Sequence, residues 1–229
     1  MELSPRLLCI AHFVPPGKVV ADIGTDHALL PVYLIKTGRV SRVIGVEKAG
    51  GPLAAARLAV TSRGFEGFID VRCGDGLTAL KPGEAQVIVL AGMGGHTIKE
   101  ILAKSPGVRQ AAERLVMQPM AQAGALRLWL AGHGWRIVDE ELVRDGGRLF
   151  QVIVAEPGKQ EVDDQLLQEI GPRLVAKKHP LLKEYLAGLL RIYEKILTGL
   201  QKSNRPEARE KAGNIQDKMA KLEEILACL

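Results

Sequence analysis

Between residues 19 and 154 the chain alternates short, β-branched apolar runs with longer segments of helical periodicity. Runs of this kind, bounded by glycine, aspartate or proline and separated by helices, favour a parallel sheet covered on both faces. The expected strands span residues 19–23, 43–47, 69–73, 87–90 and 115–118. The expected helices span residues 28–37, 52–62, 96–104 and 122–132, with a further short helix over residues 3–13. The alternation therefore predicts a doubly wound α/β fold.

The end of this region has a different pattern. Two extended runs, residues 135–143 and 148–154, are joined by Arg144-Asp145-Gly146-Gly147. Asp-Gly between two such runs is a strong hairpin signal. A mostly parallel sheet that ends in an antiparallel hairpin is typical of class I, Rossmann-like methyltransferases, and nicotinamide-binding domains usually lack the hairpin.

Past residue 158 the strand patterns stop. Leu182, Leu189 and Ile196 recur every seven residues, and a second apolar series runs from Ala208 to Leu226 in steps of four and three. This spacing is that of a coiled-coil seam. We expect residues 180–229 to form an antiparallel helical hairpin, preceded by a helix and a linker. The predicted domains are therefore a methyltransferase domain over residues 1–158 and an α-helical coiled-coil domain over residues 159–229.

Composition excludes several classes of protein. With 47% hydrophobic and 25% charged residues, the 229-residue chain is expected to fold rather than to be disordered. Its net charge of +5 is compatible with a polyanionic partner but does not require one. Cys9, Cys73 and Cys228 are widely separated, which supports neither a disulfide framework nor a cysteine-rich zinc site. Without a signal peptide or a long apolar run, the expected location is the cytoplasm and no membrane contact is expected.

Acidic residues mark the ends of the first three expected strands. Asp22 closes the first strand, Glu47 ends the second and Asp75 follows the third. At the carboxyl edge of such a sheet, a carboxylate in the place of Glu47 can accept both hydroxyls of a ribose. Each acid alone is more often a turn or a solvated residue, but the three together favour a nucleoside-like cofactor.

The loop after the first strand narrows the choice of cofactor. Gly24 lets backbone N–H groups approach a ligand, and the Gly-x-Gly-x-x-Gly pattern that a pyrophosphate needs is absent. S-adenosylmethionine has no phosphate, so one glycine can suffice. The predicted cofactor-binding residues are Asp22, Gly24, Thr25, Glu47, Lys48, Asp75, Gly76, Ala91, Gly92 and Met93.

Two side chains in this loop are unusual for a cofactor holder. Asp26 and His27 stand where many methyltransferases carry glycine or another small residue, so they could point toward a substrate and are the predicted catalytic residues. The alternative is a structural Asp–His pair. A metal site is not expected, because no further ligands cluster nearby. The glycine-rich run 91–95 leaves room for a large planar group, or is simply a tight turn.

Several motifs together resemble one known family, the bacterial TrmK family of tRNA (adenine-N1)-methyltransferases that act on adenine 22. They are Asp22-Ile23-Gly24-Thr25-Asp26-His27, Gly74-Asp75-Gly76-Leu77, Ala91-Gly92-Met93-Gly94-Gly95 and Gln118-Pro119. The resemblance covers residues 3–156 and extends loosely through the tail. It implies a Rossmann-like domain with a coiled-coil domain, S-adenosylmethionine as cofactor and tRNA as partner. Phe150 departs from the tyrosine expected there.

The chemistry that the resemblance implies needs little proton transfer. Adenine N1 has an in-plane lone pair and can attack a sulfonium methyl directly, so positioning supplies most of the catalysis. The product ring is cationic, and Asp26 is the candidate to stabilise it, with His27 orienting Asp26 or contacting the base. The base must first be extruded from the tRNA.

Two questions stay open at this stage. Ten basic residues between Arg173 and Lys211 could bind the tRNA backbone, or they could form a solvated face, because acids are interspersed among them. The alternative functions are a class I methyltransferase acting on another RNA, a small molecule or a protein, and a non-catalytic cofactor-binding scaffold. A homo-oligomer is neither indicated nor excluded.

Overall fold

The computed structural model describes residues 2–48, 50–162, 164–202 and 205–229. The chain forms two compact units, one ending at Glu169 and the other beginning at Ile170. This division lies eleven residues beyond the boundary that the sequence suggested after residue 158, which stays a prediction.

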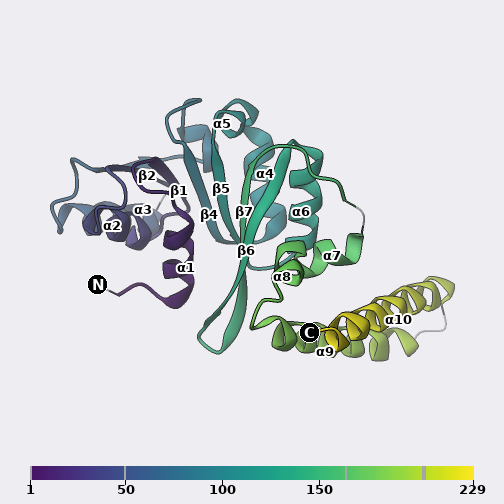
Figure 1. Ribbon diagram of the computed structural model, residues 1–229. Helices are drawn as coiled ribbons and strands as arrows, with labels where there is room; N and C mark the ends of the chain where they lie inside the picture. Colours follow the sequence, from purple (N-terminus) through teal and green to yellow (C-terminus); the bar gives the residue numbers. More distant parts are fainter. Residues whose placement is uncertain (1, 49, 163, 203–204) are drawn as a thin grey trace. The chain divides into compact units, whose positions relative to one another are not determined.

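The first unit is built on a seven-stranded sheet with the order β3-β2-β1-β4-β5-β7-β6 (Figure 1). Strands β1 to β5 are parallel, and β7 lies antiparallel to both β5 and β6. The strands are β1 (Val19–Ile23), β2 (Arg42–Glu47), β3 (Ile69–Cys73), β4 (Val87–Met93), β5 (Arg114–Pro119), β6 (Trp135–Asp145) and β7 (Arg148–Pro157). The predicted sheet and its hairpin ending are confirmed.

Alternate side chains of the sheet enter two separate apolar cores. On β1, Ala21 and Ile23 join one core, whereas Val20 joins the other. This alternation follows from the period of two in a strand, and it explains why strands covered on both faces read as continuous apolar runs. The helices that cover the faces are α1 (Pro5–Phe13), α2 (Leu29–Lys36), α3 (Gly50–Thr61), α4 (Gly95–Lys104), α5 (Pro106–Gln110) and α6 (Ala123–Gly132).

The turn of the hairpin has the backbone that its sequence demands. Gly146 has φ +54° and Gly147 has φ +74°, so both central residues lie in the left-handed region. A two-residue turn of this kind matches the twist of the two strands and requires residues that tolerate positive φ. Elements that the sequence did not reveal are the short helix η1 (Gly76–Ala79) and α5.

A buried arginine fixes the outer part of this unit. Arg127 of α6 is fully buried, and its Nε donates to Glu140 Oε1 of β6 at 2.6 Å. Its Nη2 donates to Gln151 Oε1 of β7, and its Nη1 donates to the Gln168 carbonyl in α7 (Gln165–Ile170). The guanidinium therefore joins four elements, and its own buried donors find acceptors in the three others.

The second unit contains α8 (Pro172–Ala176), α9 (Leu182–Gln201) and α10 (Pro206–Ala227). The two long helices pack against each other, as expected of a helical hairpin (Figure 1). Leu182 and Leu186 are buried, but the expected seam residue Ile196 is 44% exposed. The helical hairpin is confirmed, and the coiled-coil packing stays a prediction. None of the described helices has the length and hydropathy to cross a membrane.

Candidate functional site

The loop that joins β1 to α2 has a strained backbone. Gly24, Asp26 and Ala28 have φ values of +75°, +47° and +52°. Left-handed conformations cost little for glycine, but they are uncommon for other residues and concentrate at functional sites. Backbone hydrogen bonds hold the loop, because the N–H groups of Gly24 and Thr25 both donate to the Val46 carbonyl at the end of β2.

Asp22 is a buried carboxyl at the end of β1. Burial raises its pKa from 3.8 to about 6, and the charge of Glu47 adds to the rise. The Thr25 hydroxyl is near enough to offset part of this rise. Its buried Oγ1 nevertheless completes no hydrogen bond of ordinary geometry within the described chain. The end of β1 therefore holds polar groups that a ligand can satisfy.

Two cavities open on either side of Gly24. The first, called here the Glu47 cavity, has a volume of about 250 Å³. Its lining includes Glu47, Asp75, Gly76, Met93 and Ile101, so polar groups and apolar walls alternate in it. A Cβ at Gly24 would lie 2.7 Å from Met93 Cε, and a Cβ at Gly76 would lie 2.8 Å from Ile101 Cγ2. At both positions, glycine avoids a close contact with a side chain that lines this cavity.

The polar groups of the Glu47 cavity are already arranged by the chain. Glu47 Oε2 accepts from the Asp26 N–H at 3.1 Å, and Oε1 accepts from the Lys48 N–H at 3.0 Å. Lys48 Nζ lies 3.1 Å from Asp75 Oδ1, and Lys104 Nζ lies 3.5 Å from Oδ2. The hydrogen bond from Lys48 lowers the pKa of Asp75, so this carboxyl is ionised at neutral pH.

The second cavity, called here the Asp26 cavity, has a volume of about 300 Å³. Asp22, Asp26 and His27 line one part of it, and Ala91 and Gly92 of β4 line another. His27 Nε2 lies 3.7 Å from Asp26 Oδ1, and both side chains are more than 60% exposed. Asp26 and His27 are therefore accessible to a ligand and do not form a buried structural pair.

A buried glutamine connects the floor of the Asp26 cavity to the N-terminal helix. Gln118 of β5 is fully buried, and its Oε1 accepts from Arg6 Nη1 at 2.7 Å and from the Gly92 N–H at 3.2 Å. The Arg6 guanidinium lies over the Phe150 ring, 5.6 Å from its centroid, which is within the range of a cation–π contact. Arg6 thereby becomes part of the cavity wall.

All the residues that the sequence singled out lie in these two cavities. The Glu47 cavity contains Gly24, Glu47, Lys48, Asp75, Gly76 and Met93, and the Asp26 cavity contains Asp22, Gly24, Thr25, Asp26, His27, Ala91 and Gly92. Their roles stay predictions. Sequence reasoning missed Arg6, Leu29 and Ile101 as lining residues. Arg6 lies within residues 3–156, the range that the resemblance covers, but in none of the motifs that carried it.

Comparison with known proteins shows to which family the chain belongs. The family described as "Methyltransferase domain" matches residues 3–153. The tRNA (adenine(22)-N(1))-methyltransferase of Bacillus subtilis (strain 168) is 35% identical over 235 residues, covering 99% of this chain and 98% of that protein. The chain belongs to the TrmK family.

Solved TrmK-family structures have the same fold over their whole length. The B. subtilis m1A22 tRNA methyltransferase TrmK matches with a TM-score of 0.91 and 32% identity, covering 98% of this chain and 99% of that one. A putative tRNA (m1A22) methyltransferase of Streptococcus pneumoniae, in complex with S-adenosyl-L-methionine, matches with a TM-score of 0.87 and 31% identity, covering 98% of this chain and all of that one.

The TrmK-family assignment also bears on Phe150. The expected tyrosine would add a phenol, but the contact with Arg6 needs only the face of an aromatic ring, which Phe150 supplies. Among the described residues, no group of three or more His, Cys, Asp or Glu side chains could hold a metal ion.

Proposed function

We propose that this protein transfers a methyl group from S-adenosylmethionine to N1 of an adenine, position 22, in tRNA. The names of its relatives support this activity. The structural observation that carries the proposal is the pair of cavities that share Gly24 in their lining. The Glu47 cavity is suited to a nucleoside, and the Asp26 cavity is accessible to a second ligand. A tRNA substrate also puts the proposed reaction in the cytoplasm.

The residues present fit the cofactor. Glu47 still has lone pairs available for two ribose hydroxyls, because its two backbone contacts use one position on each oxygen. The ionised Asp75 can accept from an adenine amine, and the buried Asp22 can pair with the ammonium of the amino-acid end. The absence of a Cβ at Gly24 leaves space where the cavities join. When bound, S-adenosylmethionine supplies an electrophilic methyl group.

The protein's contribution to the reaction is then positioning and charge. Ala91 and Gly92 offer a wall with little side-chain bulk, against which a planar base can lie, and the Gly92 N–H is held by Gln118. Asp26 would balance the positive charge that appears on the methylated ring. Its carboxylate is 64% exposed in the free protein, so its field is strong only when the bound nucleotide excludes water.

The decisive experiment maps the methylated nucleotide after reaction of the protein with a pool of unmodified tRNAs. The proposal expects 1-methyladenosine at position 22. Asp26→Asn is expected to lower kcat by at least tenfold, the scale of losing one charged stabilising group. Glu113→Gln removes an exposed carboxylate that lines none of the cavities and should leave kcat unchanged.

Methylation elsewhere, or of no tRNA at all, would contradict the proposal. An unchanged kcat in Asp26→Asn would instead remove only the charge-stabilising role of Asp26. In that case His27 or the backbone wall would carry the positioning that the reaction requires.

A further inference from the structure

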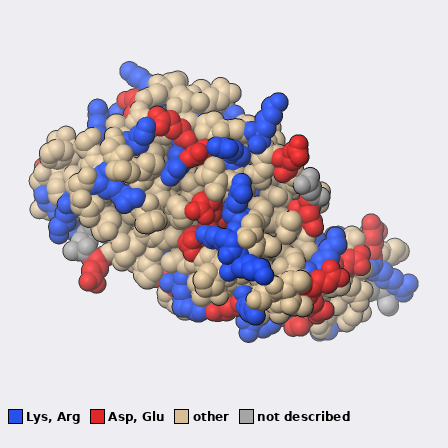
Figure 2. Space-filling view, viewed as in Figure 1, with Lys and Arg blue, Asp and Glu red and all other residues tan. Residues whose placement is uncertain are grey.

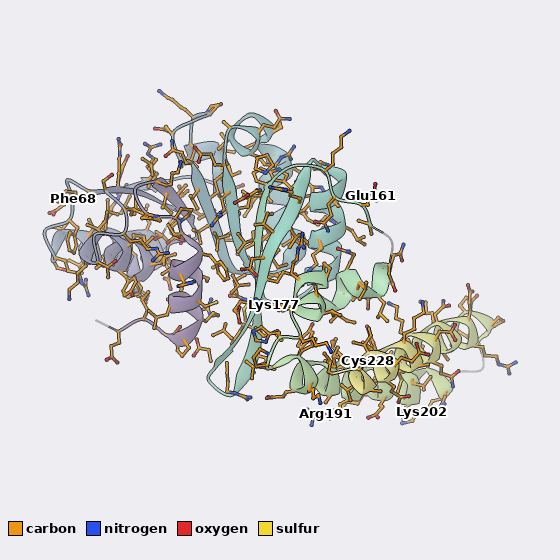
Figure 3. All side chains as sticks on the ribbon, in the orientation of Figure 1. Phe68, Glu161, Lys177, Arg191, Lys202 and Cys228 are labelled. Carbon is orange, nitrogen blue, oxygen red and sulfur yellow. The ribbon has the colours of Figure 1, made fainter. Side chains whose placement is uncertain are left out.

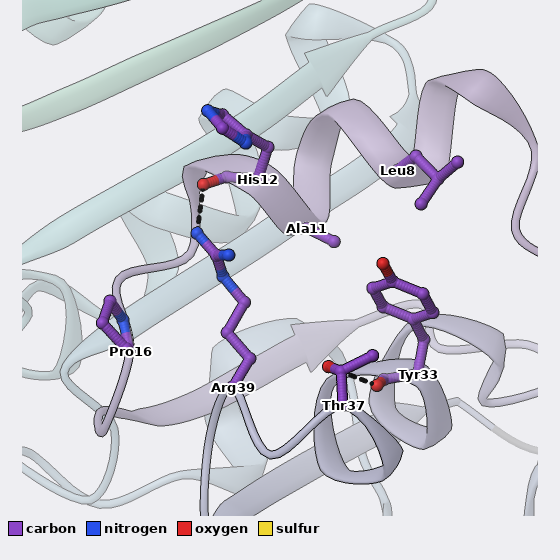
Figure 4. A pocket seen from close by; sticks show the side chains of 7 residues that line it. All are labelled: Leu8, Ala11, His12, Pro16, Tyr33, Thr37 and Arg39. Carbon is purple, nitrogen blue, oxygen red and sulfur yellow. Dashed lines mark hydrogen bonds between the residues drawn. The ribbon is translucent and has the colours of Figure 1, made fainter.

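A third cavity lies between α1 and α2, and no step of the proposed reaction uses it. Its volume is about 490 Å³, and we call it the Tyr33 cavity. Leu8, Ala11 and His12 line it from α1, and Tyr33 and Thr37 line it from α2 and its end (Figure 4). A volume of this size is within the range of cavities that hold small ligands.

The Tyr33 cavity lies along the same two helices that line the Asp26 cavity. Arg6 and Leu7 of α1 and Leu29 and Leu30 of α2 line the Asp26 cavity, whereas the next turn of each helix lines the Tyr33 cavity. Four residues of an α-helix advance about 6 Å along its axis. A single strand whose base occupied the Asp26 cavity would therefore meet the Tyr33 cavity one or two nucleotides farther along.

The chemistry of the Tyr33 cavity suits a nucleotide. The Tyr33 ring stands between the two helices with its hydroxyl directed toward α1 (Figure 4). Unpaired bases are commonly recognised by stacking on aromatic side chains. Among the described residues that line this cavity, none is acidic, and Arg39 supplies a positive charge.

The arginine is held in a fixed place before any ligand arrives. Arg39 Nε donates to the Val14 carbonyl at 2.6 Å, and Nη2 donates to the His12 carbonyl at 2.5 Å. These bonds leave Nη1 for a further acceptor. Because the side chain is already ordered, binding a phosphate through Nη1 would cost little additional conformational entropy.

We propose that the Tyr33 cavity binds an unpaired nucleotide of the substrate tRNA, one or two positions from the target adenine. Tyr33 stacks on its base and Arg39 binds its phosphate. The inference rests on the proposed tRNA substrate. The site would hold the strand on one side of the extruded base and so keep the target in the Asp26 cavity.

The test compares three full-length variants in steady-state methylation of a tRNA transcript. Tyr33→Leu removes the ring and should raise KM for tRNA about tenfold, while kcat and the affinity for S-adenosylmethionine stay at wild-type values. Tyr33→Phe keeps the ring and should retain the wild-type KM. Phe68→Leu is the matched control, because Phe68 is a 50% exposed aromatic residue that lines none of the three cavities.

A second measurement keeps the inference falsifiable if Tyr33→Leu proves unstable. The wild-type protein is irradiated with tRNA that carries 5-iodouridine at the positions flanking the target. Cross-links to the peptide that contains Tyr33 support the inference. Cross-links confined to other peptides, or an unchanged KM in a folded Tyr33→Leu protein, overturn it. If the wild-type protein methylates no tRNA, the proposed function itself fails, and this outcome is distinct from a loss of the Tyr33 subsite alone.

Discussion

The buried Asp22 carboxyl makes a quantitative prediction about stability. Its pKa rises from 3.8 to about 6 on folding, and each unit of pKa corresponds to about 1.4 kcal/mol. The free protein therefore loses about 3 kcal/mol of stability at pH 7.5, where Asp22 must be ionised in a buried place. Asp22→Asn removes this cost, and we expect the variant to be more stable than the wild type by about that amount.

The sign of the pH dependence follows from the direction of the shift. Below pH 3.8 the carboxyl is protonated in both the folded and the unfolded states, so it adds no cost. As the pH rises from 3.8 to 6, only the unfolded state releases the proton, and the folded state becomes relatively less stable. The advantage of Asp22→Asn should be about 3 kcal/mol at pH 7.5, roughly half of that at pH 5 and absent near pH 3.5.

Urea unfolding at several pH values, with the cofactor removed, measures this advantage directly. In parallel, isothermal titration should show that Asp22→Asn binds S-adenosylmethionine at least tenfold more weakly, since the variant lacks the charge that pairs with the ammonium. The wild type should itself bind more weakly as the pH falls through 6. A stability difference between variant and wild type that is the same at every pH would refute the assigned pKa.

Three further predictions concern other parts of the chain. Gly24→Ala should weaken cofactor binding at least tenfold in a titration, because Gly24 has φ +75° and lies beside Met93. The control Gly64→Ala has φ +69° and open space around it, so it should lower only the stability of the fold, by the backbone strain of about 1 kcal/mol. Arg127→Met should destabilise the first unit by about 3–5 kcal/mol in urea unfolding, since Glu140 is left buried without its charge partner, and adding Glu140→Gln should recover part of the loss. Replacing Lys183, Arg191 and Lys195 of α9 together with alanine should lower the salt dependence of tRNA binding by roughly one unit of slope per lost phosphate contact, and an unchanged slope would mean that these residues form a solvated face.

The charge pattern of the tail shows why that last experiment is needed. The ten basic residues that could either bind RNA or form a solvated face are all exposed: Arg173, Lys177, Lys178, Lys183, Arg191, Lys195, Lys202, Arg205, Arg209 and Lys211. Acidic and basic side chains are intermixed on the visible surface of α9 and α10 (Figure 2). Arg191 of α9 and Lys202, just past its end, are both exposed (Figure 3). The exposure of these basic side chains is compatible both with RNA binding and with a solvated face.

The sequence predicted the parallel sheet because its signal is local. Strands β1 and β2 are apolar runs with buried residues on both faces. An acid lies at or within two residues of the end of each of the first three strands, so the same short segments mark both the strand ends and the candidate ligands. The hairpin was predictable for the same reason, since two successive residues with positive φ demand a pair such as Gly146-Gly147.

Other features depend on contacts between residues far apart in the chain. Arg6 joins the Asp26 cavity only because α1 packs beside β5, which brings it to Gln118, 112 positions later. Arg127 would be read as an exposed helical residue, and its burial becomes favourable only when Glu140, Gln151 and a carbonyl of α7 surround it. The Tyr33 cavity likewise exists only between two packed helices.

The position of Gly24, in the lining of both the Glu47 cavity and the Asp26 cavity, has a consequence for the design of inhibitors. A compound that joins a nucleoside to a second planar ring through a short linker across Gly24 would occupy both cavities at once. Linking two weak ligands in this way can raise overall affinity by about 10²–10⁴-fold without a new contact, provided that the linker spans the sites. Because a side chain at this position would narrow the same passage, resistance by substitution of Gly24 should also impair the enzyme.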